Sequence, residues 1–196
     1  MDKDSYLEMT DEKLAGLVQK GDGEIFGYLM TRYQPKLFRY GRKFLSDLDG
    51  IDDVVQDVFI KVYENIQSFD LSQKFSPWIY RIAHNAYVDR LKKQSRLPIS
   101  LPDFDTLLSH TAAEDPVRQE KEREEIKKIV DKGLEKLSPN YREIIILYYL
   151  EEMDYKSIAQ ILRIPIGTVG IRLKRGKEAL KKIYDSLNID INEHGK

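Results

Sequence analysis

The chain has 196 residues and a formal net charge of −1 at pH 7, so its overall charge indicates no particular partner. It contains no cysteine, which excludes a disulfide framework and thiolate metal sites. The N-terminal residues lack a basic start followed by an apolar run, and no stretch approaches the length of a membrane span. We therefore expect a soluble, cytoplasmic protein with no signal peptide and no direct membrane insertion.

Helical periodicity dominates the sequence and no segment alternates as a strand would, so the predicted fold class is all-α. Thr10 predicts a helix start, because Asp11 and Glu12 would then lie near the positive end of the helix dipole. The residues KGDG at 20–23 end that helix. A second helix is expected over 24–45, and Pro35 inside it predicts a kink or a break.

A third helix is expected from about Asp52, and the pattern then breaks into a loop over 67–75. The following helix has a clear start signal, since Ser76 can cap it and Pro77 suits its first position. Composition shifts at Pro98, where prolines and acidic residues replace the helical pattern. We predict that this stretch is an acidic, flexible linker between two helical domains.

Helix returns at about residue 117, and Ser138 with Pro139 repeats the cap-then-proline signal. The helices expected after the linker cover residues 117–136, 139–150, 155–162 and 167–186. The predicted division of the chain is a first domain over 1–97, the linker over 98–116, a second domain over 117–187 and a tail over 188–196.

Charge is distributed unevenly along the chain. Residues 47–70 hold seven acids against one lysine, whereas residues 78–97 hold five cations against one acid. Residues 163–182 hold seven cations against one acid. Two basic helices in two separate domains, with an acidic helix before the first, predict a chain that touches an anionic polymer at two points.

Residues 155–180 have the pattern of a helix-turn-helix. Ala159 is the small residue that allows close helix approach, and Pro165 ends the turn at the start of the second helix. The predicted shared core consists of Ile158, Leu162, Ile164, Val169 and Leu173. The residues left on the outer face are Thr168, Ile171, Arg172, Lys174 and Arg175. Arginine can pair with guanine and lysine with phosphate, so this face is a candidate DNA reader. The alternative is a structural hairpin with a solvated basic face.

The segment LSPNYREIIILYYLEEMDYKSIAQILRIPIGTVGIRLKRGKEAL resembles the C-terminal DNA-binding domain of bacterial RNA polymerase sigma factors, in particular the two-domain extracytoplasmic-function group. Two further motifs, DDVVQDVFIKVYENI and FSPWIYRIAHNAYVDRLKK, resemble the polymerase-binding and promoter-melting helices of that family. Three motifs in the family's order are far more specific than one helix-turn-helix. The resemblance covers roughly residues 10–97 and 117–186.

The chain departs from the family pattern at three positions. It has Arg163 where the family usually has glycine in the turn, and Gly170 and Ile171 where the family usually has lysine and serine. Glycine inside a helix costs about 0.5–1 kcal/mol relative to alanine. These departures affect the promoter sequence that is expected, and not the expectation of DNA binding.

The resemblance implies that the helix from about 75 to 96 separates the DNA strands. Aromatic rings there can stack on exposed bases and cations can hold the strand's backbone. The candidate residues for the melted strand are Phe69, Trp78, Tyr80, Arg81, Asn85, Arg90, Lys92 and Lys93. Phe69 with its loop and Asn85 are implied to form a pocket for one flipped base. For Trp78 the alternative is a core aromatic, and for Asn85 a solvent-facing amide.

The acidic helix resembles the surface with which the family binds the polymerase clamp. The candidate residues are Asp52, Asp53, Gln56 and Asp57, which lie near one face because residues three or four apart are helix neighbours. The alternatives are a solvated face or a carboxylate metal site, although no histidine lies nearby in sequence to complete a coordination shell. The linker is implied to pass near the polymerase active-site channel, or it is an ordinary solvated tether.

No motif for catalysis or nucleotide binding is present, and His84, His110 and His194 are scattered. His84 is expected to face solvent or DNA. We therefore predict no catalytic residue, no metal, no cofactor and no small-molecule substrate. The expected partners are core RNA polymerase, promoter DNA and an inhibitory anti-sigma protein. The competing readings are a stand-alone helix-turn-helix regulator and a helical carboxylate enzyme or adaptor with no role on DNA.

Overall fold

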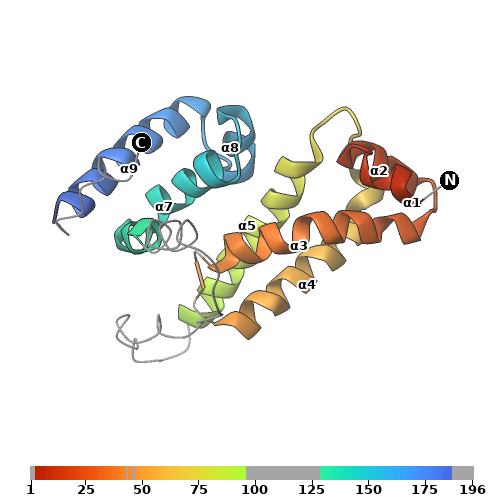
Figure 1. The fold of residues 1–196 in the computed structure, drawn as a ribbon, viewed down its shortest axis with the longest axis horizontal. Coiled ribbons are helices and arrows are strands. Elements are labelled where there is room, and N and C mark those ends of the chain that lie inside the picture. The colour runs from red at the N-terminus through yellow and green to blue at the C-terminus, as the bar shows by residue number, and fades with distance from the viewer. Residues whose placement is uncertain (1–2, 43, 46, 96–128, 187–196) are drawn as a thin grey trace, which may run out of the picture.

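A computed structural model describes residues 3–42, 44, 45, 47–95 and 129–186. Among these residues every regular element is helical and none is a strand, which confirms the all-α prediction. The helices form two domains, one from each described half of the chain (Figure 1). The predicted linker and tail, and therefore the exact domain boundaries, lie outside the described residues.

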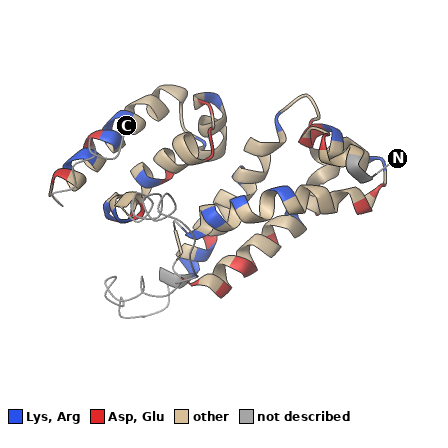
Figure 2. Ribbon diagram, viewed as in Figure 1, with Lys and Arg blue, Asp and Glu red and all other residues tan. Residues whose placement is uncertain are grey.

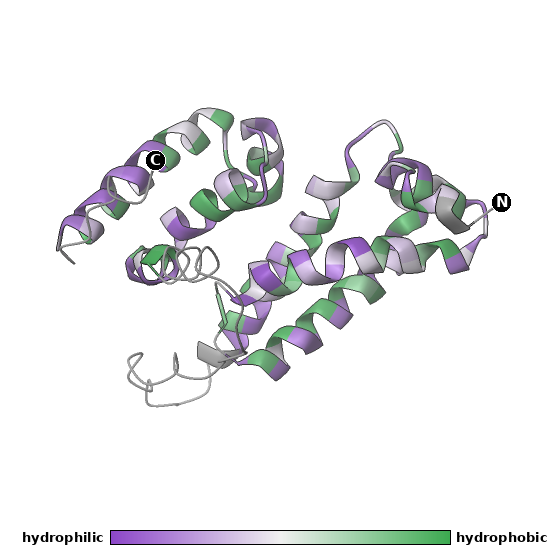
Figure 3. Cartoon of the chain, in the orientation of Figure 1, coloured by the Kyte–Doolittle hydropathy of each residue, from purple (hydrophilic) through white to green (hydrophobic). Residues whose placement is uncertain are grey.

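The first domain is built from amphipathic helices around one apolar core. Its elements are α1 (Lys3–Leu7), α2 (Asp11–Gln19), η1 (Gly23–Ile25), α3 (Phe26–Arg42), α4 (Leu48–Asn65), η2 (Ile66–Ser68) and α5 (Phe75–Ser95). Hydrophobic and hydrophilic bands alternate along α4, as the helical period requires (Figure 3). Leu14, Leu29, Leu37, Val58 and Ile79 are fully buried, one or more from each long helix.

The second domain follows the predicted pattern closely. Residues 129–136 are helical, and the next elements are α7 (Pro139–Ile145), the π-helical η3 (Ile146–Leu150), α8 (Tyr155–Leu162) and α9 (Ile166–Ser186). Ser138 occupies the N-cap position before Pro139, but its side chain makes no capping hydrogen bond. Asp154 does cap α8, where its carboxylate accepts from the Ser157 amide at 2.7 Å.

Two sequence predictions about helix starts in the first domain were wrong, and Pro35 does not break its helix. Helix α3 runs continuously through Pro35. Helix α4 begins at Leu48, before Asp52, and Gly50 in its first turn leaves room for the Asp47 and Arg90 side chains close to the backbone. Helix α5 begins at Phe75, whose amide donates to Glu12 Oε1 at 3.0 Å, so a residue distant in sequence does the capping expected of Ser76.

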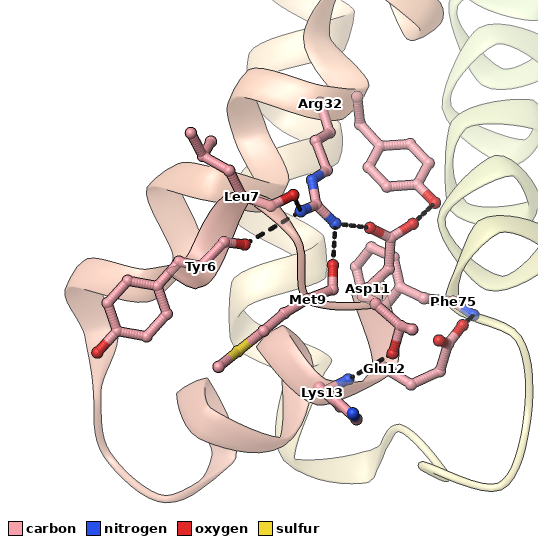
Figure 4. Close-up of polar contacts among 10 residues, drawn as sticks. Tyr6, Leu7, Met9, Asp11, Glu12, Lys13, Arg32 and Phe75 are labelled. Carbon is pink, nitrogen blue, oxygen red and sulfur yellow. Dashed lines mark hydrogen bonds and ion pairs between the residues drawn. The ribbon is translucent and has the colours of Figure 1, made fainter. Parts of the chain in front are cut away.

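A polar network holds the N-terminal segment against α3 (Figure 4). Arg32 donates to Asp11 Oδ1 at 2.7 Å and to the main-chain oxygens of Met9 and Leu7 at 2.7 and 2.6 Å. The other oxygen of Asp11 accepts from the Tyr33 hydroxyl at 2.5 Å. Burial and the Asp11 carboxylate raise the pKa of Tyr33, so its hydroxyl remains a proton donor.

The turn between α8 and α9 contains a backbone conformation that most residues avoid. Arg163 ends α8 with φ 53° and ψ 45°, the left-handed region in which glycine is usual. A side chain in this region costs about 1–2 kcal/mol. The turn is nonetheless closed by Ile164, whose amide donates to Ala159 O at 3.2 Å.

Replacing Arg163 with glycine is expected to stabilise the second domain by about 1 kcal/mol. Glycine removes the strain of the left-handed conformation, but its greater freedom in the unfolded chain cancels part of that gain. Hydrogen exchange of the α8 and α9 amides in the full chain measures this change. Arg163→Ala is the matched control, since it removes the guanidinium and keeps the strain. Equal stabilisation by both variants would contradict the strain argument.

Candidate nucleic-acid interfaces

The helix-turn-helix core is formed as the sequence predicts. Ile158, Val169 and Leu173 are buried where α8 meets α9, and Ala159, Leu162 and Ile164 pack against them partly buried. Gly176 lets α9 approach α7 closely, because a Cβ there would lie 3.3 Å from Ile145. The second helix is therefore held firmly on one side, which leaves its other side to meet a ligand.

The outer face of α9 carries the five predicted reading residues. Ile171 is 56% exposed, Lys174 and Arg175 are exposed, and Thr168 and Arg172 are half-buried. Basic residues also follow along the later turns of the helix (Figure 2). An exposed helix face with guanidinium, ammonium and one apolar group can contact base edges and phosphates in a major groove.

Gly170 does not mark a close approach on this helix. A Cβ at that position would meet only Tyr155 Cε2, at an ordinary contact distance of 3.5 Å. Space therefore does not require glycine here, and nothing in the structure explains its presence in place of a better helix former.

A surface groove of about 360 Å³ lies in the first domain, between the end of α4, η2 and α5. Its lining residues are Lys61, Asn65, Ser68, Trp78, Ile82 and Asn85. The Asn65 side chain donates to Lys61 O at 2.7 Å, and the Ser68 hydroxyl donates to Asn65 O at 2.7 Å. These local hydrogen bonds hold the α4 and η2 side of the groove in place.

The groove has the chemistry needed to hold a base. Trp78 is half-buried against Phe69 and Phe75, with ring centroids 4.9 and 5.4 Å apart, so its indole is held in place. Asn85 is exposed at the edge of the groove and can pair with a base edge, while Lys61 can meet a phosphate. The sequence singled out Trp78, Asn85 and the loop 67–75, which contains Ser68, but not Lys61, Asn65 or Ile82, since only the fold brings α4 to α5.

Two aromatic residues predicted to serve the melted strand are buried. Phe69, implied to help form the base pocket, is 5% exposed and packs edge-on against Phe75, so it supports Trp78 from inside. Tyr80 is 1% exposed, and its hydroxyl donates to Glu151 of the second domain. Direct stacking of Tyr80 on a base is not compatible with this conformation, because a stacking ring must present a free face.

The cations proposed for the melted strand remain at the surface of α5. Lys92 and Lys93 are exposed, and Arg81 and Arg90 are half-buried. Arg90 lies 3.9 Å from Asp47, and Lys92 lies 3.9 Å from Asp89. Exposed pairs of this length contribute little stability, so these cations can change partners when a phosphate approaches.

The acidic residues of α4 form a surface strip on the side away from the core. Asp53, Gln56 and Asp57 are exposed, and Asp52 is half-buried with its carboxylate accepting from Gln56 Nε2 at 2.9 Å. Acidic bands mark this helix in Figure 2. Ile60, 56% exposed one turn further on, adds an apolar group that sequence reasoning missed. Protein interfaces place apolar side chains inside a polar rim, so Ile60 among these polar residues makes the strip a candidate protein-binding surface.

His84 is directed toward the second domain and not into open solvent. It is half-buried, and its Nδ1 lies 2.6 Å from Glu143 Oε1 of the second domain. Within the described ranges no group of His, Asp or Glu residues is arranged to hold a metal ion. Those ranges also contain no helix long and apolar enough to cross a membrane.

Comparison with known proteins identifies the family of the chain. The Sigma-70 region 2 family matches residues 29–97, and the Sigma-70, region 4 family matches residues 127–180. The ECF RNA polymerase sigma factor SigW of Bacillus subtilis (strain 168) is 33% identical over 188 residues, covering 90% of this chain and 97% of the relative. The ECF RNA polymerase sigma-E factor of Escherichia coli (strain K12) is 34% identical over 180 residues, covering 88% and 93%.

A solved structure of CnrH in complex with the cytosolic domain of CnrY has a similar fold. It superposes with a TM-score of 0.66 at 26% sequence identity and covers 90% of this chain and 97% of CnrH. The groove lies in the segment that matches region 2, and the exposed face of α9 begins in the segment that matches region 4. The chain therefore belongs to the extracytoplasmic-function (ECF) family of RNA polymerase sigma factors.

Proposed function

We propose that this protein is a dissociable subunit that gives core RNA polymerase its choice of promoter and helps to open the DNA there. The observation that supports the proposal is the presence, on one chain of this family, of two different candidate nucleic-acid surfaces: the exposed face of α9 and the groove beside Trp78. A stand-alone regulator would need the first surface and has no use for the second.

The second domain reads paired DNA in this proposal. Helix α9 enters the major groove, where Arg172 and Arg175 pair with base edges, Lys174 meets phosphate and Ile171 contacts a thymine methyl. Thr168 lies near the start of the helix and contacts the backbone. The support for these roles is the exposure of the face and its spacing on one helix.

The first domain holds the separated strand. One unpaired base enters the groove between Trp78 and Asn85, and stacking and hydrogen bonding offset the few kcal/mol that unstacking costs. The cations of α5, namely Arg81, Arg90, Lys92 and Lys93, follow the strand's phosphates. Phe69 contributes indirectly by holding the Trp78 indole.

The polymerase binds the acidic strip of α4, through Asp52, Asp53, Gln56 and Asp57 with the exposed Ile60 beside them. The protein works by binding and not by catalysis, and it acts in the cytoplasm where the polymerase meets the chromosome. We also propose an inhibitory anti-sigma partner, because the similar protein CnrH was solved with the cytosolic domain of CnrY bound.

Reconstituted transcription tests the proposed function. Purified chain and core RNA polymerase are combined with a genomic DNA library, and the start sites are mapped. The expected result is initiation at a defined set of promoters only when both proteins are present. A chain that fails to bind core polymerase, and that protects a palindromic site alone, would instead be a stand-alone regulator.

Replacing Asn85 with alanine is expected to impair DNA opening more than polymerase binding, because the exposed amide at the groove would read the unpaired base. Loss of one such contact costs about 1–3 kcal/mol, which is a five- to 150-fold reduction in open complex. Permanganate reactivity of the melted region measures opening, and co-elution measures polymerase binding. An equal loss of both would make Asn85 a structural residue.

A further inference from the structure

Helix α2 holds the segment 66–75, which leads from the end of α4 to the first residue of α5. The Gln19 side chain donates to the main-chain oxygens of Ile66 and Phe69 at 2.7 and 2.8 Å. A further bond runs the other way, since the Gln67 side chain donates to Gln19 O at 3.1 Å. These hydrogen bonds attach the first part of the segment to the end of α2.

The same helix holds the far end of the segment. Glu12 Oε1 accepts from the Phe75 amide at 3.0 Å (Figure 4). Between these two attachments Gly16 leaves room for the middle of the segment, because a Cβ there would lie 3.3 Å from Leu71 Cδ1. Glu12, Gly16 and Gln19 are spaced i, i+4 and i+7, so one face of α2 makes all of these contacts.

The attached segment supplies two parts of the groove that faces the melted strand in the proposed function. Ser68 lines the groove, and Phe69 packs against the Trp78 indole with ring centroids 4.9 Å apart. A shift of this main chain would move one wall of the groove and also the ring that supports the indole. Helix α2 therefore sets the shape of a site that residues of α4, η2 and α5 line.

The segment needs these contacts because little else orders it. Residues 70–74 are exposed, so burial contributes little to fixing their conformation. An exposed segment without such attachments samples many conformations, and only a fraction of them completes the groove. A ligand that requires the complete groove then binds more weakly in proportion to that fraction. Hydrogen bonds made before the ligand arrives remove this cost.

We infer that Glu12, Gly16 and Gln19 are positioning residues, which hold the segment 66–75 so that the groove keeps the shape that receives an unpaired base. This inference rests on the proposed function, because it describes how the groove assigned to the melted strand is maintained. Helix α2 lies before residues 29–97, which match the Sigma-70 region 2 family, so the positioning comes from outside the matched segment.

The test uses two pairs of variants in the full chain. Gln19→Met keeps the length of the side chain and removes its amide donors, and the matched control is Gln34→Met, the same change at an exposed position of α3. Glu12→Ala removes the acceptor of the Phe75 amide, whereas Glu12→Gln keeps a carbonyl oxygen that can accept. The glutamine variant is therefore expected to retain what the alanine variant loses.

Two measurements on the free chain show whether the segment has moved. Hydrogen exchange of the Phe69, Gln73 and Phe75 amides, which are hydrogen-bonded in the parent protein, is expected to be faster in Gln19→Met and Glu12→Ala. Acrylamide quenching of Trp78, the one tryptophan of the chain, is expected to rise as Phe69 withdraws. Unchanged exchange and quenching in both variants would overturn the inference.

Fluorescence anisotropy of the holoenzyme measures the functional consequence. The probe is a fluorescein-labelled single strand of about 12 nucleotides, within the size of known single-strand sites, that carries the melted sequence of a promoter mapped by reconstituted transcription. If the loosened segment completes the groove about one-tenth of the time, Gln19→Met weakens this binding about tenfold. The Gln34→Met control and Glu12→Gln are expected to bind as the parent protein does.

Strands with one abasic site, placed at each position in turn, separate positioning of the groove from a general loss of structure. The parent holoenzyme is expected to lose most affinity at the position whose base enters the groove. Gln19→Met should bind that one abasic strand as tightly as the parent does, because the groove is empty in both complexes. A damaged fold would instead weaken binding to every strand.

Equal affinity of Gln19→Met and Gln34→Met for the intact strand would overturn the inference, and so would a loss that persists on the abasic strand. A parent holoenzyme that shows no base-dependent position on any strand would contradict the proposed function instead. In that case hydrogen exchange and quenching would still decide whether α2 holds the segment.

Discussion

Replacing Arg175 with alanine is expected to weaken recognition of the upstream promoter element by about 1–3 kcal/mol, provided that its guanidinium pairs with a base edge. Arg175 is exposed on the outer face of α9, one turn after the exposed Ile171, and makes no contact that would be lost from the protein's own core. Arg172 is half-buried on the same face, and its replacement is expected to have an effect in the same direction. Gel-shift titration of the holoenzyme on a mapped promoter measures both.

Lys181→Ala is the control for these variants, because it removes one exposed cation from the last turns of the same helix. Its effect should be uniform across promoter sequences and should vanish at high salt, as expected of a general phosphate attraction. Full promoter affinity in both arginine variants would rule out the proposed reading face. A loss that is the same for all sequences would assign these arginines to the DNA backbone.

Replacing Asp11 with alanine is expected to lower the free energy of unfolding of the first domain by about 2–3 kcal/mol. The Asp11 carboxylate accepts from Arg32 and from the buried Tyr33 hydroxyl, so its loss leaves two donors without that acceptor. Arg32 keeps its main-chain acceptors, which limits the penalty. Urea unfolding followed by tryptophan fluorescence isolates this domain, because the one tryptophan of the chain, Trp78, lies in α5.

The control for this experiment is Asp22→Ala, since Asp22 is exposed and its side chain makes no capping bond at the start of η1. It is expected to change the unfolding free energy by less than about 0.5 kcal/mol. If the two variants were equally stable, the hydrogen bonds around Arg32 would contribute nothing measurable to the stability of the domain. Hydrogen exchange should then show α1 and α2 opening freely in the parent protein as well.

The sequence predicted the second domain best, because two of its helices carry local start signals. Pro139 and Pro165 each mark a helix start, and α8 runs over the residues expected for it. The start of α5 was misplaced because Glu12, far away in the chain, supplies the acceptor for the Phe75 amide. Local patterns carry no information about a capping group of that kind.

The difference between local signals and contacts among distant residues also decides which parts of the candidate site could be predicted. Periodicity placed Ile171, Lys174 and Arg175 on the outer face of α9, since one amphipathic helix decides which side is buried. Periodicity could not show that Lys61 of α4 lines the same groove as Asn85 of α5, because two helices must first pack together. Nor could it show that Tyr80 is covered by Glu151, since the two residues belong to different domains.

The pairing of Tyr40 and Tyr80 with glutamates of the other half of the molecule has a practical consequence for dissection of the protein. A recombinant fragment that stops before residue 129 would carry both phenols uncovered and would lack the anions that normally shield them. Such a fragment is expected to self-associate more readily than the intact polypeptide does, because α8 no longer covers α5. Measurements on isolated halves therefore describe a species with more exposed apolar surface than the whole chain has.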